Sequence, residues 1–278
     1  MGSALSLFYS PIQNVGSLAT DLARWATTPV NPYRFVPEEE DAYQVQEILL
    51  GFSLPLELVQ VILDEAEYWP RLICQRESEP HLLQVNTTPE NDHFGTRCYL
   101  ISPKIPEFSK SGKSRILLRR IVFHTFSRDQ GWSTSSFPGR YEGSHTWFDA
   151  VIFRGLRDND EENPDRTYRR IKAGTLRNRP GVPSQVLSTY TNSDTWALQK
   201  NIRASSSEHL HEIVWDRDDP SPCSASPTEF SEVTGSGLGQ GFVRELRPGD
   251  NIAVLAKAQY PGWCNHVGGV DMQILYAV

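Results

Sequence analysis

Two aromatic and glycine-rich blocks hold the residues of this chain that are best suited to bind or act on a ligand. They span residues 129–149 and 248–266, and both place Trp and Tyr at turns between segments of alternating polarity. Loops carried on a sheet are common binding sites. We therefore expect the two blocks to meet at one end of a β-structure and to form an aromatic pocket. The residues predicted to contact a substrate there are Trp132, Tyr141, Trp147, Asp149, Trp263 and Asn265.

Three polar side chains in or beside the blocks could act on a bound molecule. His145, His266 and Arg154 could donate hydrogen bonds to a substrate carbonyl, so we predict them as the catalytic groups. Tryptophan rings combined with a few polar groups suit a sugar ring or a flat hydrophobic metabolite. For each ring, burial in the core of the fold is the structural alternative.

Motifs for other chemistries are incomplete. His209 and His211 share one face of an expected strand, but Glu212 lies on the opposite face, so we predict no metal site. The glycines of residues 235–241 lack the preceding strand, the following helix and the Lys of a phosphate-binding loop. The sequence also contains no Gly-x-Ser-x-Gly motif of serine hydrolases. These observations predict neither a metal nor a cofactor.

Composition excludes several classes of partner. A formal net charge of −7 disfavours nucleic-acid binding, and acidic residues 158–162 are expected to neutralise the basic cluster at 166–172. No apolar run approaches the roughly 20 residues of a transmembrane helix, and the four cysteines lack disulfide or metal spacing. We therefore predict a cytoplasmic protein. Gly2 fits a myristoylation pattern, which would give only a weak membrane tether.

The hydrophobic periodicity changes near residue 80. Residues 1–80 are predicted to form a helical extension that packs on the main domain, with helices over 12–26, 39–50 and 55–69; a partner-binding arm is the alternative. Residues 81–278 alternate with period two, which predicts a mainly β fold, a jelly-roll-like antiparallel β-sandwich. The expected strands are 82–86, 96–101, 116–127, 145–154, 168–175, 185–191, 196–204, 210–216, 241–246, 251–258 and 267–277.

Two stretches resemble known families. Residues 54–63 read Leu-Pro-Leu-Glu-Leu-Val-Gln-Val-Ile-Leu, and this segment resembles a degenerate form of the opening helix of an F-box. The C-terminal part, with Trp132, Trp147 and the sequence Trp263-Cys-Asn-His266, resembles a β-sandwich domain of fungal proteins that is similar to F-box-associated and galactose-binding-like jelly rolls. The resemblance implies a sandwich fold and an adaptor role.

Two functions follow as hypotheses. The first is a cofactor-free enzyme that binds a hydrophobic small molecule in the aromatic pocket, such as a cyclase or Diels–Alderase-like pericyclase of fungal secondary metabolism. Such reactions depend on orientation of the substrate more than on a nucleophile. The alternative is a non-enzymatic lectin-like or F-box-type adaptor that recognises a glycan or a protein. A deep cavity would favour the enzyme, and an open aromatic surface would favour the binding module.

Overall fold

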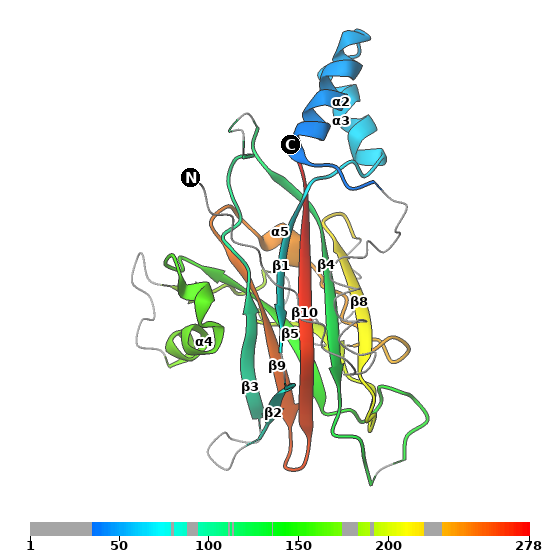
Figure 1. The fold of residues 1–278 in the computed structure, drawn as a ribbon, viewed down its shortest axis with the longest axis vertical. Helices are drawn as coiled ribbons and strands as arrows, with labels where there is room; N and C mark the ends of the chain where they lie inside the picture. Colours follow the sequence, from blue (N-terminus) through cyan, green and yellow to red (C-terminus); the bar gives the residue numbers. More distant parts are fainter. Residues whose placement is uncertain are drawn as a thin grey trace, which may run out of the picture. The chain divides into compact units, whose positions relative to one another are not determined.

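A computed structural model describes residues 35–78, 81–87, 94–110, 112, 114–134, 136–173, 183–189, 192–219 and 230–278. Residues 36–278 form one compact unit whose main body consists of two antiparallel β-sheets (Figure 1). The prediction of a mainly β fold is confirmed. The helix expected at 12–26 and the acylation pattern at Gly2 lie outside the described residues. No helix in the described part of the chain is long and apolar enough to cross a bilayer.

The first sheet is built around its longest strand, β10. Its strand order is β1-β10-β4-β8, and β2 also pairs with β10. The strands are β1 (Arg71–Glu77), β2 (Leu83–Asn86), β4 (Leu117–Arg128), β8 (His209–Asp216) and β10 (Cys264–Ala277). We expected strands to begin at residue 81, but β1 begins at Arg71, directly after Pro70. It pairs with the second half of β10, from Arg71 opposite Leu275 to Glu77 opposite Gly269.

The second sheet has the strand order β3-β9-β5-β6, and β7 also pairs with β5. Its strands are β3 (Phe94–Ile101), β5 (Thr146–Arg154), β6 (Ser184–Gln185), β7 (Trp196–Lys200) and β9 (Asn251–Gln259). Strand β5 is central and apolar on both faces, as its sequence predicts. Phe148 and Ile152 face the first sheet, whereas Val151 and Phe153 face outward, and all four side chains are fully buried.

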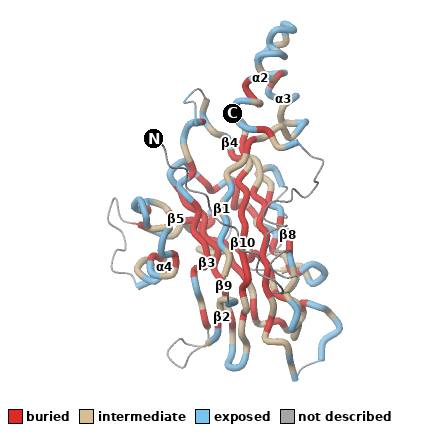
Figure 2. Tube along the Cα trace, viewed as in Figure 1, coloured by how far each residue is buried: buried red, intermediate tan, exposed pale blue. Residues whose placement is uncertain are grey.

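The main core lies between the two sheets (Figure 2). Phe123 and Met272 from the first sheet pack in one cluster with Phe148 and Val254 from the second sheet. This placement explains the alternation in the sequence, because each strand turns every second side chain toward the opposite sheet. Helix α5 (Phe242–Glu245) closes part of this core, because the centroid of its Phe242 ring lies 5.0 Å from that of Trp196 and 4.9 Å from that of Trp215.

Two segments that we expected to be strands are helices, and this part of the prediction was wrong. Residues 241–246 form the single turn of α5, and residues 168–175 overlap α4 (Pro164–Lys172), which follows the 3-10 turn η1 (Asp160–Glu162). The Asn163 side chain accepts a hydrogen bond from the Arg166 amide and caps α4, and Pro164 fits its first turn. Tyr168 of α4 packs on the outer face of the second sheet.

Three of the four basic side chains of α4 pair with carboxylates, although only Asp160 comes from the acidic stretch 158–162 that was expected to neutralise them. Their ion pairs are Arg169 with Asp165, Arg170 with Asp160, and Lys172 with Asp194. Arg166 is exposed, and it is the basic residue of α4 for which the described residues provide no ion pair.

Two antiparallel helices, α2 (Glu39–Gly51) and α3 (Leu56–Glu65), form a hairpin that stands on one end of the sheets (Figure 1). They match the helices predicted over 39–50 and 55–69, although α3 ends four residues early. Glu39 accepts a hydrogen bond of 2.6 Å from the hydroxyl group of Tyr276 in β10, and the Tyr43 hydroxyl donates to Ser109 Oγ at 2.7 Å. Buried polar contacts thus attach the start of α2 to the sheets.

Candidate functional site

The two aromatic blocks meet at one end of the sheets, around the turn between β9 and β10. The indole ring of Trp263 stands edge-on to the His145 ring, with 4.8 Å between the ring centroids. The Tyr260 ring approaches His145 edge-on at the same distance. Trp132 belongs to the first block, and its ring carbon lies 3.9 Å from the point where a Cβ on Gly262 would stand. The structure therefore brings Trp132, His145 and Trp263 together.

The turn exposes part of this aromatic group and strains the backbone. Tyr260 has φ of +69°, a left-handed conformation that costs a bulky L-residue roughly 1–2 kcal/mol. The Trp263 amide donates to the Tyr260 carbonyl at 3.3 Å and closes the turn. Trp132 is 60% exposed and Tyr260 is 44% exposed. Burial, reinforced by Lys200, lowers the pKa of His145, so its ring is neutral at pH 7.

Trp147 and Asp149 lie on the outer face of the second sheet, beside Lys257 of β9. The Nζ atom of Lys257 is 2.5 Å from Asp149 Oδ2 and 5.9 Å from the centroid of the Trp147 ring. Burial raises the pKa of Asp149, and the Lys257 charge opposes this rise. A carboxylate at this position must be paired or face a cavity. The ion pair with Lys257 meets that requirement without a ligand.

Asn265 lies in the interior and joins the two sheets. Its Nδ2 atom donates to the carbonyl oxygens of Trp147 at 3.0 Å and of Lys257 at 3.3 Å, both in the second sheet. Its Oδ1 atom accepts from Asn201 Nδ2 at 2.9 Å. The side chain is fully buried, so these contacts give it a structural role.

Buried polar groups extend this network toward the first aromatic block. Asn201 accepts from Ser127 Oγ at 2.7 Å and donates to Thr146 Oγ1 at 3.0 Å. Asp129, also fully buried, accepts from the amides of Gln130 at 2.7 Å and Ala204 at 2.9 Å. Burial raises the pKa of Asp129 to about 6, against the opposing effect of these hydrogen bonds. The network fixes the loops that carry the aromatic residues.

Tyr141 lies apart from the Trp263 group, on the inner face of β8. Its ring centroid is 5.9 Å from that of His211, and Gly235 packs directly against it. Burial lowers the pKa of His211 to about 4, with smaller contributions from His209 and Arg140, so its ring is neutral. Within the described ranges, no group of three or more His, Cys, Asp or Glu side chains could hold a metal ion.

The predicted catalytic histidines face opposite sides of the molecule. Thr146 points into the interior, where Asn201 binds it, so its neighbour His145 points to the outer face of the second sheet. In the first sheet, Asn265 points inward, and the next residue, His266, points outward beside the exposed Gln84. The two imidazole groups therefore cannot act on one substrate in this arrangement.

Arg154, the third predicted catalytic group, ends β5 at the edge farthest from His145. Its Nε and Nη2 atoms bind the two carboxylate oxygens of Asp250 at 2.8 and 2.7 Å. Arg154 lies nine positions after His145 along extended chain, a distance of about 30 Å. Arg154 therefore anchors the turn before β9, and the structure does not bring it to the aromatic group.

Three described cavities lie at the other end of the sheets, around the base of the α2–α3 hairpin. A cavity of about 370 Å³ opens between α3 and the ends of β4 and β10, and one of about 520 Å³ lies between α3 and the end of β8. The third, of about 460 Å³, adjoins the start of α2. None of the nine predicted site residues lines these three cavities.

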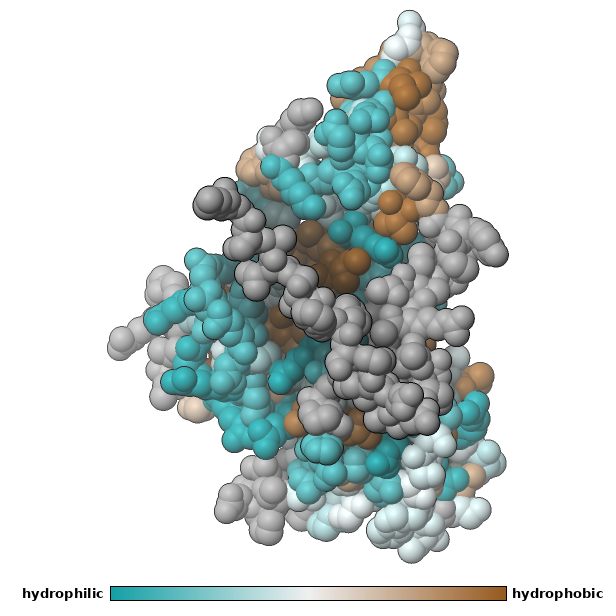
Figure 3. Space-filling model, viewed as in Figure 1, coloured by the Kyte–Doolittle hydropathy of each residue, from teal (hydrophilic) through white to brown (hydrophobic). Residues whose placement is uncertain are grey.

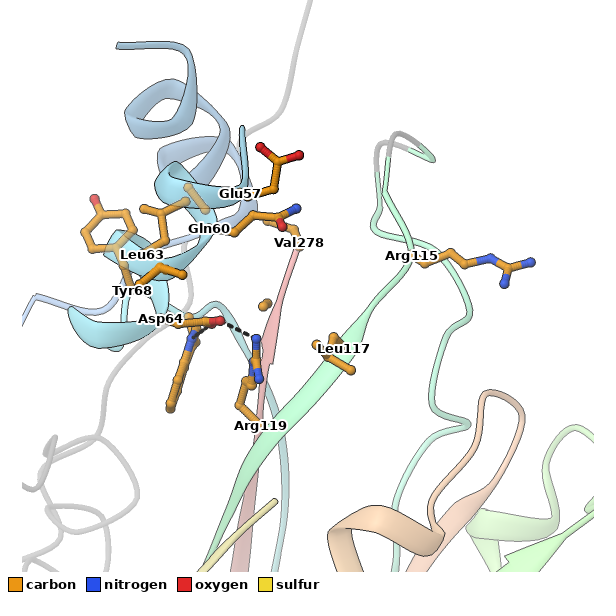
Figure 4. A pocket seen from close by; sticks show the side chains of 13 residues that line it. Glu57, Gln60, Leu63, Asp64, Tyr68, Arg115, Leu117, Arg119 and Val278 are labelled. Atoms are coloured by element: carbon orange, nitrogen blue, oxygen red, sulfur yellow. Dashed lines mark hydrogen bonds and ion pairs between the residues drawn. The ribbon is translucent and has the colours of Figure 1, made fainter. Parts of the chain in front are cut away.

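An ion pair between Asp64 and Arg119 lines both of the first two cavities, and Figure 4 shows it in the first. Arg119 of β4 contacts the Asp64 carboxylate, which also accepts a hydrogen bond of 3.0 Å from Trp69 Nε1. Leu63 and Gln60 of α3 lie above this pair in the view, whereas Arg115 points away from the helices.

A second ion pair fixes the end of the hairpin. Arg120 binds both oxygens of Glu67 at 2.9 and 3.0 Å, and its Nε donates to Asp216 at 2.5 Å. The guanidinium carbon also lies 5.4 Å from the centroid of the Trp69 ring. Two consecutive arginines of β4 thus hold the end of α3 and the following residue Glu67 against β4, and Arg120 also pairs with Asp216 of β8.

The helices keep a large apolar surface in contact with solvent, which the favoured prediction of a packed extension did not foresee and which the alternative of a partner-binding arm would require. Figure 3 shows hydrophobic side chains gathered over the hairpin. The seven residues that we call the apolar face are between 37% and 74% exposed: Ile48, Leu50, Phe52, Leu56, Leu58, Val61 and Ile62. In α3, only Val59 is fully buried. The sequence did contain a signal for this surface, because α3 is apolar on more than one side. A helix that packs against the protein on one side can bury only one of them.

No protein-family model matches this chain, and no curated protein matches its sequence. The resemblances to an F-box helix and to galactose-binding-like domains stay predictions. Function is therefore inferred from the geometry.

Proposed function

We propose that this protein is a non-enzymatic adaptor that docks another protein through the apolar face of the α2–α3 hairpin. The observation that carries the proposal is the exposure of seven large apolar side chains within residues 48–62. Single exposed apolar residues are common on protein surfaces, whereas a contiguous patch marks an interaction site. Phe52, at 74% exposed, is the most prominent of the seven.

The attachment of the hairpin to the sheets supports this role. Glu39 and Tyr43 fix the start of α2, and the ion pairs of Arg119 and Arg120 fix the end of α3. A surface that is already ordered loses little conformational entropy when a partner binds. An apolar hairpin held in this way is therefore well suited to docking.

The cofactor-free cyclase stays a prediction with less support. Its proposed catalytic groups, His145, His266 and Arg154, lie apart, and Asp149 and Asn265 are engaged in structural contacts. The aromatic group around Trp263 is partly exposed, which suits a binding surface better than an enclosed reaction chamber. Jelly-roll topology for the two sheets likewise stays a prediction.

A second candidate function is recognition of a ring-shaped ligand, such as a sugar, at the aromatic end. It is favoured by the adjacent exposure of Trp132 and Tyr260 and by the left-handed backbone of Tyr260, since strain of this kind gathers at functional sites. Screening a glycan panel with the protein and its Trp132→Ala variant tests it. Equal binding profiles would remove this candidate.

Site-specific photo-crosslinking tests the adaptor function. A benzophenone amino acid is placed at Phe52 in one sample and at Val233, which is 85% exposed and outside the hairpin, in the control. In cells that naturally produce the protein, we expect a discrete heterologous product only from position 52. The Leu58→Asp substitution should remove that product. Identical products from both positions, or a product that contains only a second copy of the chain, would refute the proposal.

A further inference from the structure

The charge of the hairpin identifies the chemistry of its partner. We infer that the apolar face binds a basic amphipathic segment of another protein, an inference that rests on the proposed function. Residues 36–70 contain nine acidic residues and no Lys, Arg or His, while the whole chain has a net charge of −7. The hairpin and its flanks therefore carry more negative charge than the entire chain.

Several of these carboxylates lie on the same two helices as the apolar face and have no neutralising partner among the described residues. Among the described residues, no cationic group lies within 4 Å of the carboxylates of Glu40, Glu47, Glu57 or Glu65. Asp64 and Glu67 differ, because Arg119 and Arg120 hold them. The paired carboxylates thus anchor the hairpin, and the unpaired ones remain able to attract a cation.

The two cavities beside α3 supply complementary subsites. The cavity of about 370 Å³ has Val61, Leu63 and Leu117 among its lining residues and is large enough for an apolar side chain of the partner. The neighbouring cavity of about 520 Å³ is lined by six carboxylates and two arginines, Arg119 and Arg120, so its lining carries an excess of negative charge. Since Val61 lines both cavities, an apolar anchor and a Lys or Arg a few residues away could be bound side by side.

The same charge argues against other occupants. A symmetric contact between two copies would place each acidic hairpin against an identical one, and like charges repel. Anionic membrane surfaces and nucleic acids attract basic surfaces and repel acidic ones. A basic amphipathic protein segment is complementary both to the apolar face and to the acidic side chains of the same hairpin.

Synthetic peptides of one length and one leucine-rich helical face test this inference. Three versions carry Lys, Gln or Glu at the flanking positions, and binding to the full chain is measured by titration calorimetry at low salt. We expect the Lys peptide to bind at least tenfold more tightly than the Glu peptide. Added salt should reduce the difference, because it screens exposed charges.

Three variants locate the effect. Replacement of Glu40, Glu47, Glu57 and Glu65 by Gln should reduce the ratio of the affinities for the Lys and Glu peptides to below threefold. It should leave the affinity for the Gln peptide nearly unchanged. A control of equal charge, with glutamine at Glu77, Glu161, Glu162 and Glu232, should keep the preference. Val61→Ser should weaken all three peptides.

The outcomes separate this inference from the proposed function. A Glu peptide that binds as tightly as the Lys peptide would overturn the basic partner, and so would a preference that survives neutralisation of the hairpin. Absence of binding by every peptide at 1 mM would overturn it as well. In each of these cases, a specific crosslink from position 52 would still support docking by the apolar face.

Discussion

Replacing Asn265 with Ala distinguishes a structural side chain from a ligand-binding one. In the structure, the Asn265 amide makes three buried hydrogen bonds that connect the first sheet to Trp147, Lys257 and Asn201. If these bonds are its role, the substitution should lower stability and leave the surface of the aromatic end unchanged. If Asn265 instead contacts a ligand, as the sequence predicted, stability should hardly change.

The expected loss follows from the number of bonds. A buried hydrogen bond contributes about 0.5–1.5 kcal/mol net, so loss of three predicts a decrease of roughly 2–4 kcal/mol in the free energy of unfolding. Domains of this size have a stability of only about 5–15 kcal/mol, so the change is a large fraction of the total. Asn265→Asp should be worse at pH 7, because an ionised carboxylate would face the carbonyl oxygens of Trp147 and Lys257.

Urea denaturation followed by circular dichroism measures both effects. Asn86→Ala is the matched control, since Asn86 is exposed on the neighbouring strand β2, opposite Cys264, and should change stability by less than about 0.5 kcal/mol. The Asp variant should lose less stability, relative to the unmodified protein, at pH 5 than at pH 7, because protonation removes the buried charge. An Asn265→Ala protein as stable as the Asn86→Ala control would refute the structural role.

Three further predictions concern other contacts. Burial lowers the pKa of His124, but hydrogen bonds to Asp271 at 2.8 Å and Glu212 at 3.0 Å outweigh this effect and raise it above 6.5. The unmodified protein should therefore be more stable than the His124→Gln variant below pH 6.5, and this difference should disappear as the pH rises through the raised pKa. A difference between their urea midpoints that is the same at pH 5.5 and pH 8.5 would contradict this. Arg120→Met should accelerate hydrogen exchange in α3 but not in β9, whereas Arg115→Met, at a 77% exposed side chain, should alter neither. Gly237→Ala should lower the melting temperature by several degrees, because its Cβ would stand 1.8 Å from the Ala197 carbonyl oxygen, while Gly51→Ala, with nothing within 4 Å, should leave it equal or higher.

Local patterning predicted the central strands well, because their side chains alternate or are apolar throughout. It failed where tertiary contacts decide the element. In the sequence, α4 was interpreted as a strand with alternating side chains. In the structure, Tyr168 and Ile171 both pack on the outer face of the second sheet, and their spacing of three residues is that of a helix. Strand β1 contains charged residues because it lies at an edge of its sheet, so its alternation is weak.

The candidate site was predictable only in part for a related reason. Both aromatic blocks were predicted to be turns at the ends of strands, and this was enough to infer that Trp132 and the Trp263 turn lie close together. The opposite orientations of His145 and His266 depend on which sheet contains β5 and which contains β10, and a single sequence does not reveal that assignment. The cavities around α3 depend in the same way on where β4 and β10 end.

The two candidate surfaces lie near opposite ends of strand β10, which would allow an adaptor to bind two partners at the same time. Trp263 immediately precedes β10, and Ala277, the last residue of that strand, lines the cavity beside α3. The strand has 14 residues, which at about 3.3 Å per residue separates the surfaces by roughly 45 Å. A protein on the hairpin therefore leaves the aromatic end open to a second ligand. Since sites this far apart usually behave independently, substitutions at Phe52 and at Trp132 should each abolish one interaction without affecting the other.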